Sequence, residues 1–300
     1  MQQPADPARR GPASHLRRLL GALAAQSELL TEAHFAARAD CLDQLELLLL
    51  PEAEAGAGSA PLSNLRRRGR AWQARLEAVN QQFFQRLQAE IRAGQHSPPR
   101  MRQLLTTHAG RPTSTVATRY DHLDALTDGL FPEPGALPEP ESRDPEMVYY
   151  QKTPARIILE LAARLAPSDV LYDLGSGLGQ VPLLVHLLSG ATTRGIEIEP
   201  AYCRYAQACA AALNLPQVQF RCADARTADF ADATAFYLFT PFTGSIMQQV
   251  LARLRELAQM RPLRLFSYGP STGALNEQPW LLRVGEEGHL YQLAEFRSEV

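Results

Sequence analysis

The chain has 300 residues, with 30 basic residues against 32 acidic ones and a formal net charge of −2. Hydrophobic residues make up 45% and charged residues 21%, a balance that excludes collagen, coiled coil and wholesale disorder and favours a globular fold with a sizeable core. The sequence shows no apolar run of about 18 residues and no signal-peptide segment, so we expect a soluble, cytoplasmic protein without membrane contact. No Cys-x-x-Cys pair and no histidine cluster has zinc spacing, which predicts no metal site.

The first third of the chain has the pattern of helices. Apolar residues recur at helical steps along one long segment and predict a packed stripe. The stripe consists of Leu65, Trp72, Leu76, Val79, Phe83, Leu87 and Ile91. The same segment is rich in arginine, which offers a face for nucleic acid or an acidic partner; the alternative is a solvated face opposite the stripe. These arginines are Arg66, Arg67, Arg68, Arg70, Arg75, Arg86 and Arg92.

A change of composition divides the chain into parts. We predict a helical N-terminal module over residues 1–131, a Pro/Glu-rich linker over 132–145 and a second domain over 146–300. In the second domain short apolar segments alternate with helical ones, which predicts a mostly parallel sheet with helices on both faces. The expected strands are 169–174, 193–198, 218–221, 235–239, 263–267, 280–284 and 290–296. The last two are joined by a short glycine-bounded turn and must be antiparallel.

The strongest motif is a glycine-rich loop after the first strand, Asp-Leu-Gly-Ser-Gly-Leu-Gly-Gln over residues 173–180. Glycines let backbone amides approach a ligand because no Cβ is in the way. A nicotinamide fingerprint would have its third glycine at position 180, which is Gln180, so the loop departs from the pyrophosphate-binding form. The loop suits a ligand without phosphate whose amino-acid and ribose parts rest on it, with Asp173 accepting from an ammonium group. The predicted contacts are Asp173, Gly175, Ser176, Gly177, Gly179 and Gln180.

Acidic residues end the next two strands. Glu197 comes 22 residues after Gly175, the separation at which one strand–helix unit delivers a carboxylate to ribose hydroxyls. Asp224 follows the third strand and is expected to accept from an adenine amino group, while the amide of Ala225 donates to a ring nitrogen. The alternative for Asp224 is a turn-forming aspartate, which is common at strand ends.

The fourth strand ends in Thr-Pro-Phe. Because open α/β sheets bind ligands outside the carboxyl ends of their strands, Thr240 and Phe242 are expected where a transferred group meets its acceptor. Pro241 fixes the backbone there, and Phe242 supplies an apolar wall.

In this order and spacing, residues 145–300 resemble the class I S-adenosylmethionine-dependent methyltransferases. The glycine loop is most similar to that of the non-SET histone lysine methyltransferases, the "disruptor of telomeric silencing" family. The resemblance implies a Rossmann-like, mostly parallel seven-stranded sheet with an antiparallel C-terminal hairpin and S-adenosylmethionine as cofactor. It also implies cofactor contacts by Tyr150 and Thr153, in a segment that precedes the loop. The chain departs from the family in carrying Thr-Pro-Phe where the family has an asparagine-containing segment.

The sequence therefore predicts methyl transfer from S-adenosylmethionine to an amine, with a protein lysine as first choice. Thr240, Phe242 and Tyr150 are the expected catalytic residues. The alternatives are a small-molecule methyltransferase with a helical lid and a cofactor-binding module without turnover. Nucleic acid ranks below protein or a small molecule as the acceptor, because base methylation favours an Asn or Asp ahead of Pro-Pro and an aromatic residue.

Overall fold

The computed structural model describes residues 12–50, 60–108, 121–131, 146–148, 150–286 and 288–299. The predicted linker 132–145 thus lies outside the described residues. The described chain divides into two compact units. The first holds the residues up to Leu87 together with Thr107 and His108, and the second holds residues 88–106 and those from Asp121 onward. The predicted boundary after residue 131 stays a prediction.

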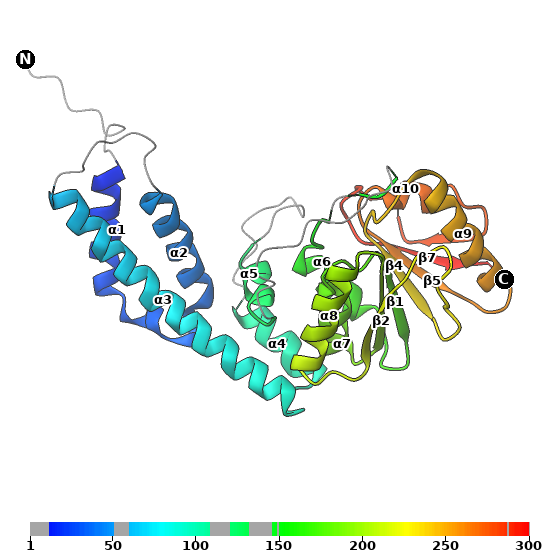
Figure 1. Cartoon of the computed structure of the whole chain (residues 1–300), viewed down its shortest axis with the longest axis horizontal. Coiled ribbons are helices and arrows are strands. Elements are labelled where there is room, and N and C mark those ends of the chain that lie inside the picture. The colour runs from blue at the N-terminus through cyan, green and yellow to red at the C-terminus, as the bar shows by residue number, and fades with distance from the viewer. Residues whose placement is uncertain are drawn as a thin grey trace, which may run out of the picture. The chain divides into compact units, whose positions relative to one another are not determined.

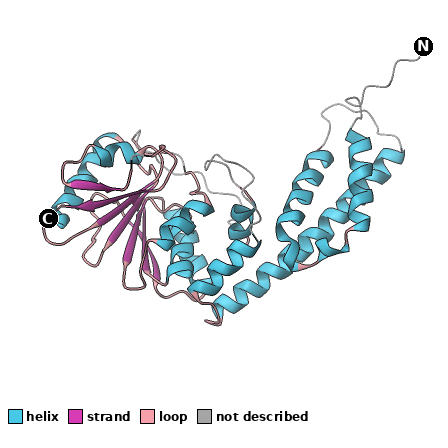
Figure 2. Cartoon of the chain, turned by 180° about the vertical axis from the view of Figure 1, so that it is seen from behind, coloured by secondary structure: helices cyan, strands magenta, loops and turns pink. Residues whose placement is uncertain are grey.

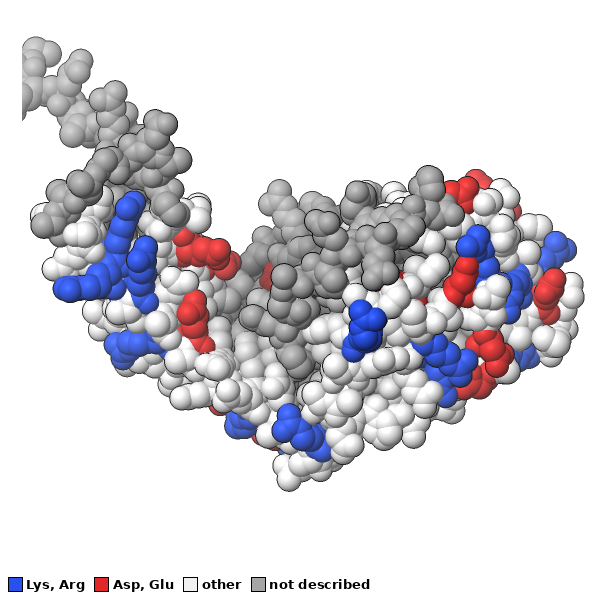
Figure 3. Space-filling model, in the orientation of Figure 1, with Lys and Arg blue, Asp and Glu red and all other residues white. Residues whose placement is uncertain are grey.

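Within the described residues, the first unit is built of helices. They are α1 (Pro12–Ala25), the short 3₁₀ helices η2 (Ser27–Leu30) and η3 (Glu32–His34), α2 (Phe35–Leu49) and α3 (Ala60–Arg92) up to Leu87. The stripe predicted on α3 faces the core: Leu76 and Phe83 are fully buried, and Trp72 packs at its edge. Charged side chains lie on the outer surface of these helices (Figure 3).

The second unit contains one seven-stranded sheet in the order β3-β2-β1-β4-β5-β7-β6. Its strands are β1 (Val170–Leu174), β2 (Thr192–Glu197), β3 (Val218–Cys222), β4 (Ala235–Leu238), β5 (Arg264–Ser267), β6 (Leu281–Val284) and β7 (Ala294–Ser298). The first five are parallel, and β7 pairs antiparallel with both β5 and β6. The predicted fold class is confirmed, including the antiparallel C-terminal pair (Figure 2).

Helices cover both faces of this sheet (Figure 1). The helices of the second unit are α4 (Pro98–His108, to Thr106), α5 (His122–Asp128), α6 (Ala155–Ala163), α7 (Gln180–Ser189), α8 (Pro200–Ala212), α9 (Gly244–Ala258) and α10 (Ser271–Asn276). Strand side chains alternate between the faces because the strand period is two. Tyr172 and Leu174 therefore pack in one core cluster with Val250 and Leu254 of α9, whereas α7 contacts β1 and β2. The carboxyl ends of β1 to β4 are left together at one edge.

Two local features differ from the expected elements. The last strand begins at Ala294 rather than at residue 290, because residues 289–292 form a turn in which the Gln292 N–H donates to the His289 carbonyl at 3.1 Å. Helix α10 was not expected, since its six residues are too few to show a helical period. None of the helices that the structure describes is long and apolar enough to cross a bilayer.

Glycine is required at position 179 by packing as well as by backbone conformation. Gly179 has φ of +83°, and a Cβ there would lie 2.6 Å from the Phe220 ring and 2.7 Å from Ala206. We expect Gly179→Ala to lower the free energy of unfolding by about 2–5 kcal/mol, from left-handed strain and overpacking together. The measurement is a denaturant titration. The matched control is Gly273→Ala in α10, where nothing lies within 4 Å of the added Cβ; an equal loss in both variants would contradict the prediction.

Candidate functional site

Two adjoining cavities form a crevice at the carboxyl ends of β1 to β4. The larger has a volume of roughly 870 Å³ with its open mouth included. The smaller lies at its inner end, and the two share Tyr150, Gln151, Gly175 and Phe239 in their walls. This is the edge at which parallel strands leave room for a ligand.

The crevice brings together residues that the sequence predicted from five separate segments. The larger cavity is lined by Tyr150, Gly175, Gly177, Glu197, Asp224, Ala225, Thr240 and Phe242. The smaller adds Thr153, Asp173, Ser176 and Gln180. Gly179 lines neither cavity, since its α-carbon faces Phe220 and Ala206. The Ser176 hydroxyl is buried without a hydrogen-bond partner and lies against Gly195 of β2, while the Ser176 N–H donates to the Ile196 carbonyl at 3.0 Å.

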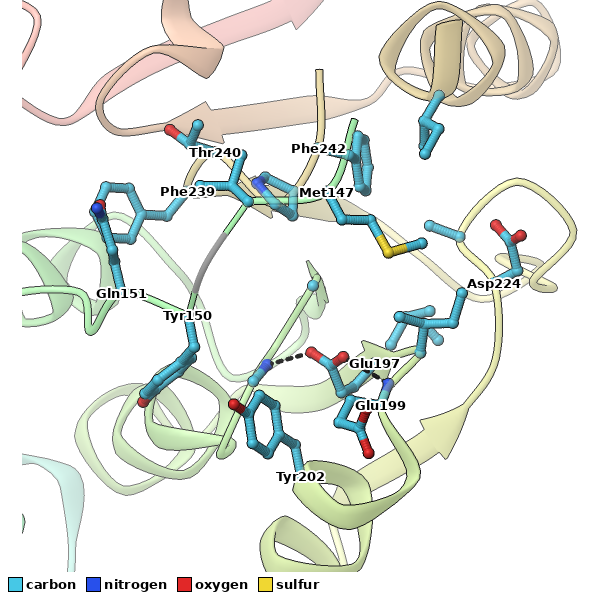
Figure 4. Close-up of a pocket in the computed structure, with 18 of the residues that line it drawn as sticks. Met147, Tyr150, Gln151, Glu197, Glu199, Tyr202, Asp224, Phe239, Thr240 and Phe242 are labelled. Atoms are coloured by element: carbon cyan, nitrogen blue, oxygen red, sulfur yellow. Dashed lines mark hydrogen bonds between the residues drawn. The ribbon is translucent and has the colours of Figure 1, made fainter. Parts of the chain in front are cut away.

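The Glu197 carboxylate joins the end of β2 to the glycine loop. Oε2 accepts from the Gly177 N–H at 2.7 Å, and Oε1 accepts from the Glu199 N–H at 2.8 Å (Figure 4). Burial raises the pKa of Glu197, while these backbone donors act in the opposite direction. Glu199 itself caps α8, because its carboxylate accepts from the Ala201 N–H at 3.2 Å. Glu197 is thus the carboxylate held at the centre of the crevice.

The inner end of the crevice holds a buried carboxyl group. Asp173 is 4% exposed, and burial, together with the charge of Glu197, raises its pKa well above the ordinary value. The hydroxyls of Thr153 and Tyr237, which both line the smaller cavity, are hydrogen-bonded to each other at 3.1 Å. The Gln180 amide oxygen is buried there without a hydrogen-bond partner. A ligand with both hydrogen-bond donors and acceptors would therefore pair with the polar groups at the inner end of the crevice.

Asp224 both lines the crevice and turns the chain after β3. Its Oδ2 lies 2.7 Å from Nη2 of Arg226, and its Oδ1 accepts from the Arg226 backbone N–H at 2.8 Å. Hydrogen bonding to Arg226 lowers the pKa of Asp224. The turn-forming role is therefore present in the structure alongside the position in the crevice. The N–H of Ala225, by contrast, has no hydrogen-bond partner among the described residues.

The loop after β4 has a strained backbone. Thr240 has φ of +45°, a region that costs an L-residue about 1–2 kcal/mol. Its N–H donates to the Ser271 hydroxyl at 2.8 Å, whereas its own hydroxyl is buried without a partner. The next residue, Pro241, packs so closely on the glycine loop that a Cβ at Gly175 would lie 2.2 Å from the Pro241 Cβ. Strain of this kind gathers at functional sites, where the surrounding structure holds it in place.

A segment before β1 forms one wall of the crevice. Met147 pairs with Phe242 in an isolated antiparallel bridge, and the Glu146 carboxylate accepts from the Ile246 N–H at 2.9 Å, which caps α9. Further along, the Tyr150 ring lies over the glycine loop, where a Cβ at Gly177 would be 2.3 Å from it. The neighbouring Tyr149 lies outside the described residues.

Helix α5 anchors this wall segment to the second unit. The buried Asp124 accepts from the Ala155 N–H at 2.7 Å, and Asp128 forms an ion pair with Lys152. Sequence reasoning missed both aspartates. The only local signal was the Asp-x-x-Asp spacing of Asp121 and Asp124, which the structure shows to be a capping box at the start of α5.

The charge of the crevice has one sign. Glu197, Glu199 and Asp224 line the larger cavity and Asp173 the smaller, whereas the described walls contain no Lys, Arg or His. The described residues include no group of three or more His, Cys, Asp or Glu able to hold a metal ion. The crevice therefore favours a cationic or neutral ligand over a phosphate-bearing one.

Comparison with known proteins gives structural likenesses only. No family model matches the chain, and no curated protein matches it. Among solved structures, the chain is similar to an RNA methyltransferase from Salinibacter ruber in complex with S-adenosyl-L-homocysteine (28% identity, 49% of this chain, 92% of that chain, TM-score 0.36). It is also similar to a SAM-dependent methyltransferase from Thiobacillus denitrificans in complex with S-adenosyl-L-homocysteine (24% identity, 37% of this chain, 47% of that chain, TM-score 0.32).

A third likeness is to precorrin-6y C5,15-methyltransferase from Geobacter metallireducens (15% identity, 53% of this chain, 92% of that chain, TM-score 0.36). The chain spans less than half of the Thiobacillus protein. These similarities cover about half of this chain or less. The ligand of the crevice is therefore inferred from the geometry of the crevice itself.

Burial of Asp173 makes the ligand-free protein sensitive to pH. Because the folded state raises the pKa of Asp173, it holds this proton more tightly than the unfolded chain does, and stability falls as the pH rises through the folded-state pKa. In Asp173→Asn this group no longer titrates, so the variant does not lose that stability as the pH rises. We therefore expect the free energy of unfolding of the variant, relative to that of the parent, to increase from about pH 5 to about pH 8. Denaturant titrations at both pH values measure it, and an advantage that stays constant or shrinks would contradict the prediction.

Proposed function

We propose that this chain is a methyltransferase that binds S-adenosylmethionine in the crevice at the carboxyl ends of β1 to β4. The observation that supports this most is Glu197, a buried carboxylate whose two oxygens are oriented by backbone donors. A carboxylate fixed in this way suits the two hydroxyls of a ribose. The charged side chains of the described walls are all acidic, which favours a cofactor that carries a sulfonium and an ammonium group over one that carries a pyrophosphate.

Each part of the cofactor has a matching group in the crevice. Glu197 would bind the ribose, and Asp173 would accept from the ammonium group at the inner end. Asp224 and the Ala225 N–H would bind the adenine edge, as expected from the sequence, and both residues line the larger cavity. The methionyl carboxylate would accept from the Thr153 hydroxyl, and the unpartnered amide oxygen of Gln180 would accept from the ammonium group. Gly175 and Gly177 leave room for Pro241 and Tyr150 to pack closely on the loop, and these two side chains would border the ligand.

The cofactor, when bound, supplies a methyl group already activated by its sulfonium, so the protein has to align the acceptor and exclude water. The strained loop at Thr240 and the buried Phe242 border the crevice beside the glycine loop. An amine acceptor must arrive uncharged, and apolar walls lower the pKa of an amine by disfavouring its ammonium form. Phe242, Met147 and Tyr150 would form such walls, which gives Thr240, Phe242 and Tyr150 the catalytic positions.

For the acceptor itself, we propose an amine and specifically a lysine side chain of a protein. The support for this finer choice is the resemblance of the glycine loop to that of the non-SET histone lysine methyltransferases. The lining of the larger cavity adds support, because its side chains are mostly apolar and its charged ones are acidic, which suits the approach of a basic side chain.

Transfer of a radioactive methyl group tests the proposal. The purified chain is incubated with tritiated S-adenosylmethionine and a lysate of the cells from which the chain comes, and the lysate is then separated by size. Label in the protein fraction, recovered as methyllysine after hydrolysis, is the expected result. Label in the small-molecule fraction would contradict the lysine acceptor and indicate that the acceptor is a metabolite. Cofactor binding without label in any fraction would contradict methyl transfer and indicate a module that only binds the cofactor.

Glu197→Gln tests cofactor binding independently of the acceptor. The amide keeps the size of the side chain but loses the charge-assisted bonds to ribose, so the dissociation constant for S-adenosyl-L-homocysteine should rise by about 10- to 100-fold, equivalent to about 1.5–3 kcal/mol. Titration calorimetry measures this change. Glu199→Gln is the matched control, because Glu199 also lines the crevice but caps α8. Equal losses in both variants would count against the ribose role of Glu197.

A further inference from the structure

Two helical segments of the first unit carry several arginines and no acidic residue. Helix α1 and residues 60–76 of α3 contain no Asp or Glu in the sequence. Their arginines are Arg17, Arg18, Arg66, Arg67, Arg68, Arg70 and Arg75. All are exposed except Arg66, which is half-buried, and no ion pair among the described residues includes any of them. We call this set the arginine surface.

Packing at Gly69 brings these arginines into one neighbourhood. A Cβ at Gly69 would lie 2.9 Å from Leu49 of α2 and 3.4 Å from Leu16 of α1, so α3 approaches both helices closely at this point. Arg17 and Arg18 directly follow Leu16, and the arginines of α3 flank Gly69 on both sides. Figure 3 shows basic side chains gathered over α1 and the start of α3, with acidic side chains over the neighbouring α2.

We propose that the arginine surface binds the phosphate backbone of a nucleic acid duplex. Guanidinium groups bind phosphate in a bidentate manner and keep their charge at all physiological pH values. Arg66 to Arg75 span roughly 14 Å of helix rise, the length of duplex axis over which one strand presents about four phosphates, at about 3.4 Å of axis for each. This binding is separate from the cofactor crevice and goes beyond the proposed methyl transfer.

Other polyanionic partners fit this surface less well. A membrane surface requires an apolar face, and no large apolar side chain is exposed on α1 or on residues 60–76. Single strands are held by stacking bases on aromatic rings. Trp72 is the aromatic side chain of these segments, and it is half-buried with the Arg75 guanidinium 4.5 Å above its ring. Contacts with the backbone of a duplex need no such ring.

Fluorescence anisotropy with the full chain tests the proposal. The probes are labelled RNA and DNA duplexes of about 16 base pairs, titrated between about 50 and 200 mM salt. For about four phosphate contacts, the logarithm of the binding constant should fall with the logarithm of salt concentration with a slope of about −4. Arg67→Glu with Arg70→Glu should weaken binding at least about tenfold and reduce the slope to about −2.

The matched control carries Arg204→Glu with Arg255→Glu, the same change of charge at exposed positions of α8 and α9. We expect the control to bind duplex like the parent, and calorimetry to give the same cofactor affinity for all three proteins. If the double Glu variant melts early, Arg67→Gln with Arg70→Gln repeats the test with a neutral side chain.

A difference in affinity between the two probes would show whether the preferred duplex is RNA or DNA, and either preference supports the proposal. Equal binding by parent and variant would overturn it, as would failure of the parent to bind duplex at the lowest salt. Competition by polyglutamate as effective as that by duplex would point to an acidic protein instead, and tighter binding of a single strand would also contradict it. None of these outcomes depends on cofactor binding, so the two proposals fail separately.

Discussion

The crevice depends on a single buried carboxylate that accepts from two backbone amides. Glu197 ties the N–H of Gly177 in the glycine loop to the N–H of Glu199 at the start of α8. The loop and the end of β2 are therefore fixed relative to one another by one side chain. Burial raises the pKa of Glu197, a cost that the two donors offset in part. Without this group, the Gly177 N–H would lose its partner inside the protein, which is expensive for a buried donor.

Carboxylates also hold the wall opposite the glycine loop. Glu146 caps α9, Asp124 accepts from the start of α6, and Asp128 pairs with Lys152. Because the wall segment has little regular structure of its own, these contacts fix where Tyr150 lies over the loop. The acidic residues of the second unit thus have two roles: some hold the wall segment in place, and others line the crevice.

Most of the fold and the central residues of the site could be predicted from the sequence, because their signals are local. A strand, a glycine turn and a helix in succession identify the loop, and Glu197 follows at a fixed distance. The wall could not be predicted, since its contacts join residues 24 to 100 positions apart. Gly179 could not be distinguished from Gly175 and Gly177, because the sequence does not show which glycine packs against Phe220 and Ala206 and which glycines line the crevice.

Asp224 shows a second limit of sequence reasoning. Both its expected roles need the same carboxylate after the same strand, and only the ion pair with Arg226 reveals that the turn-forming role is present. The left-handed backbone of Thr240 was equally hidden, since a threonine before a proline carries no signal for that conformation.

Lys152 is the one lysine among 300 residues. It lies in the segment before β1 and is paired with Asp128, but it lines neither cavity of the crevice. Its side chain is 28% accessible to solvent. Reagents that acylate lysine amines would consequently modify this protein, apart from its N-terminus, at a single position next to the glycine loop. The rate of that acylation gives a one-site chemical footprint of the wall, and any compound that closes the segment over the loop would slow it without an engineered tag or a mutation.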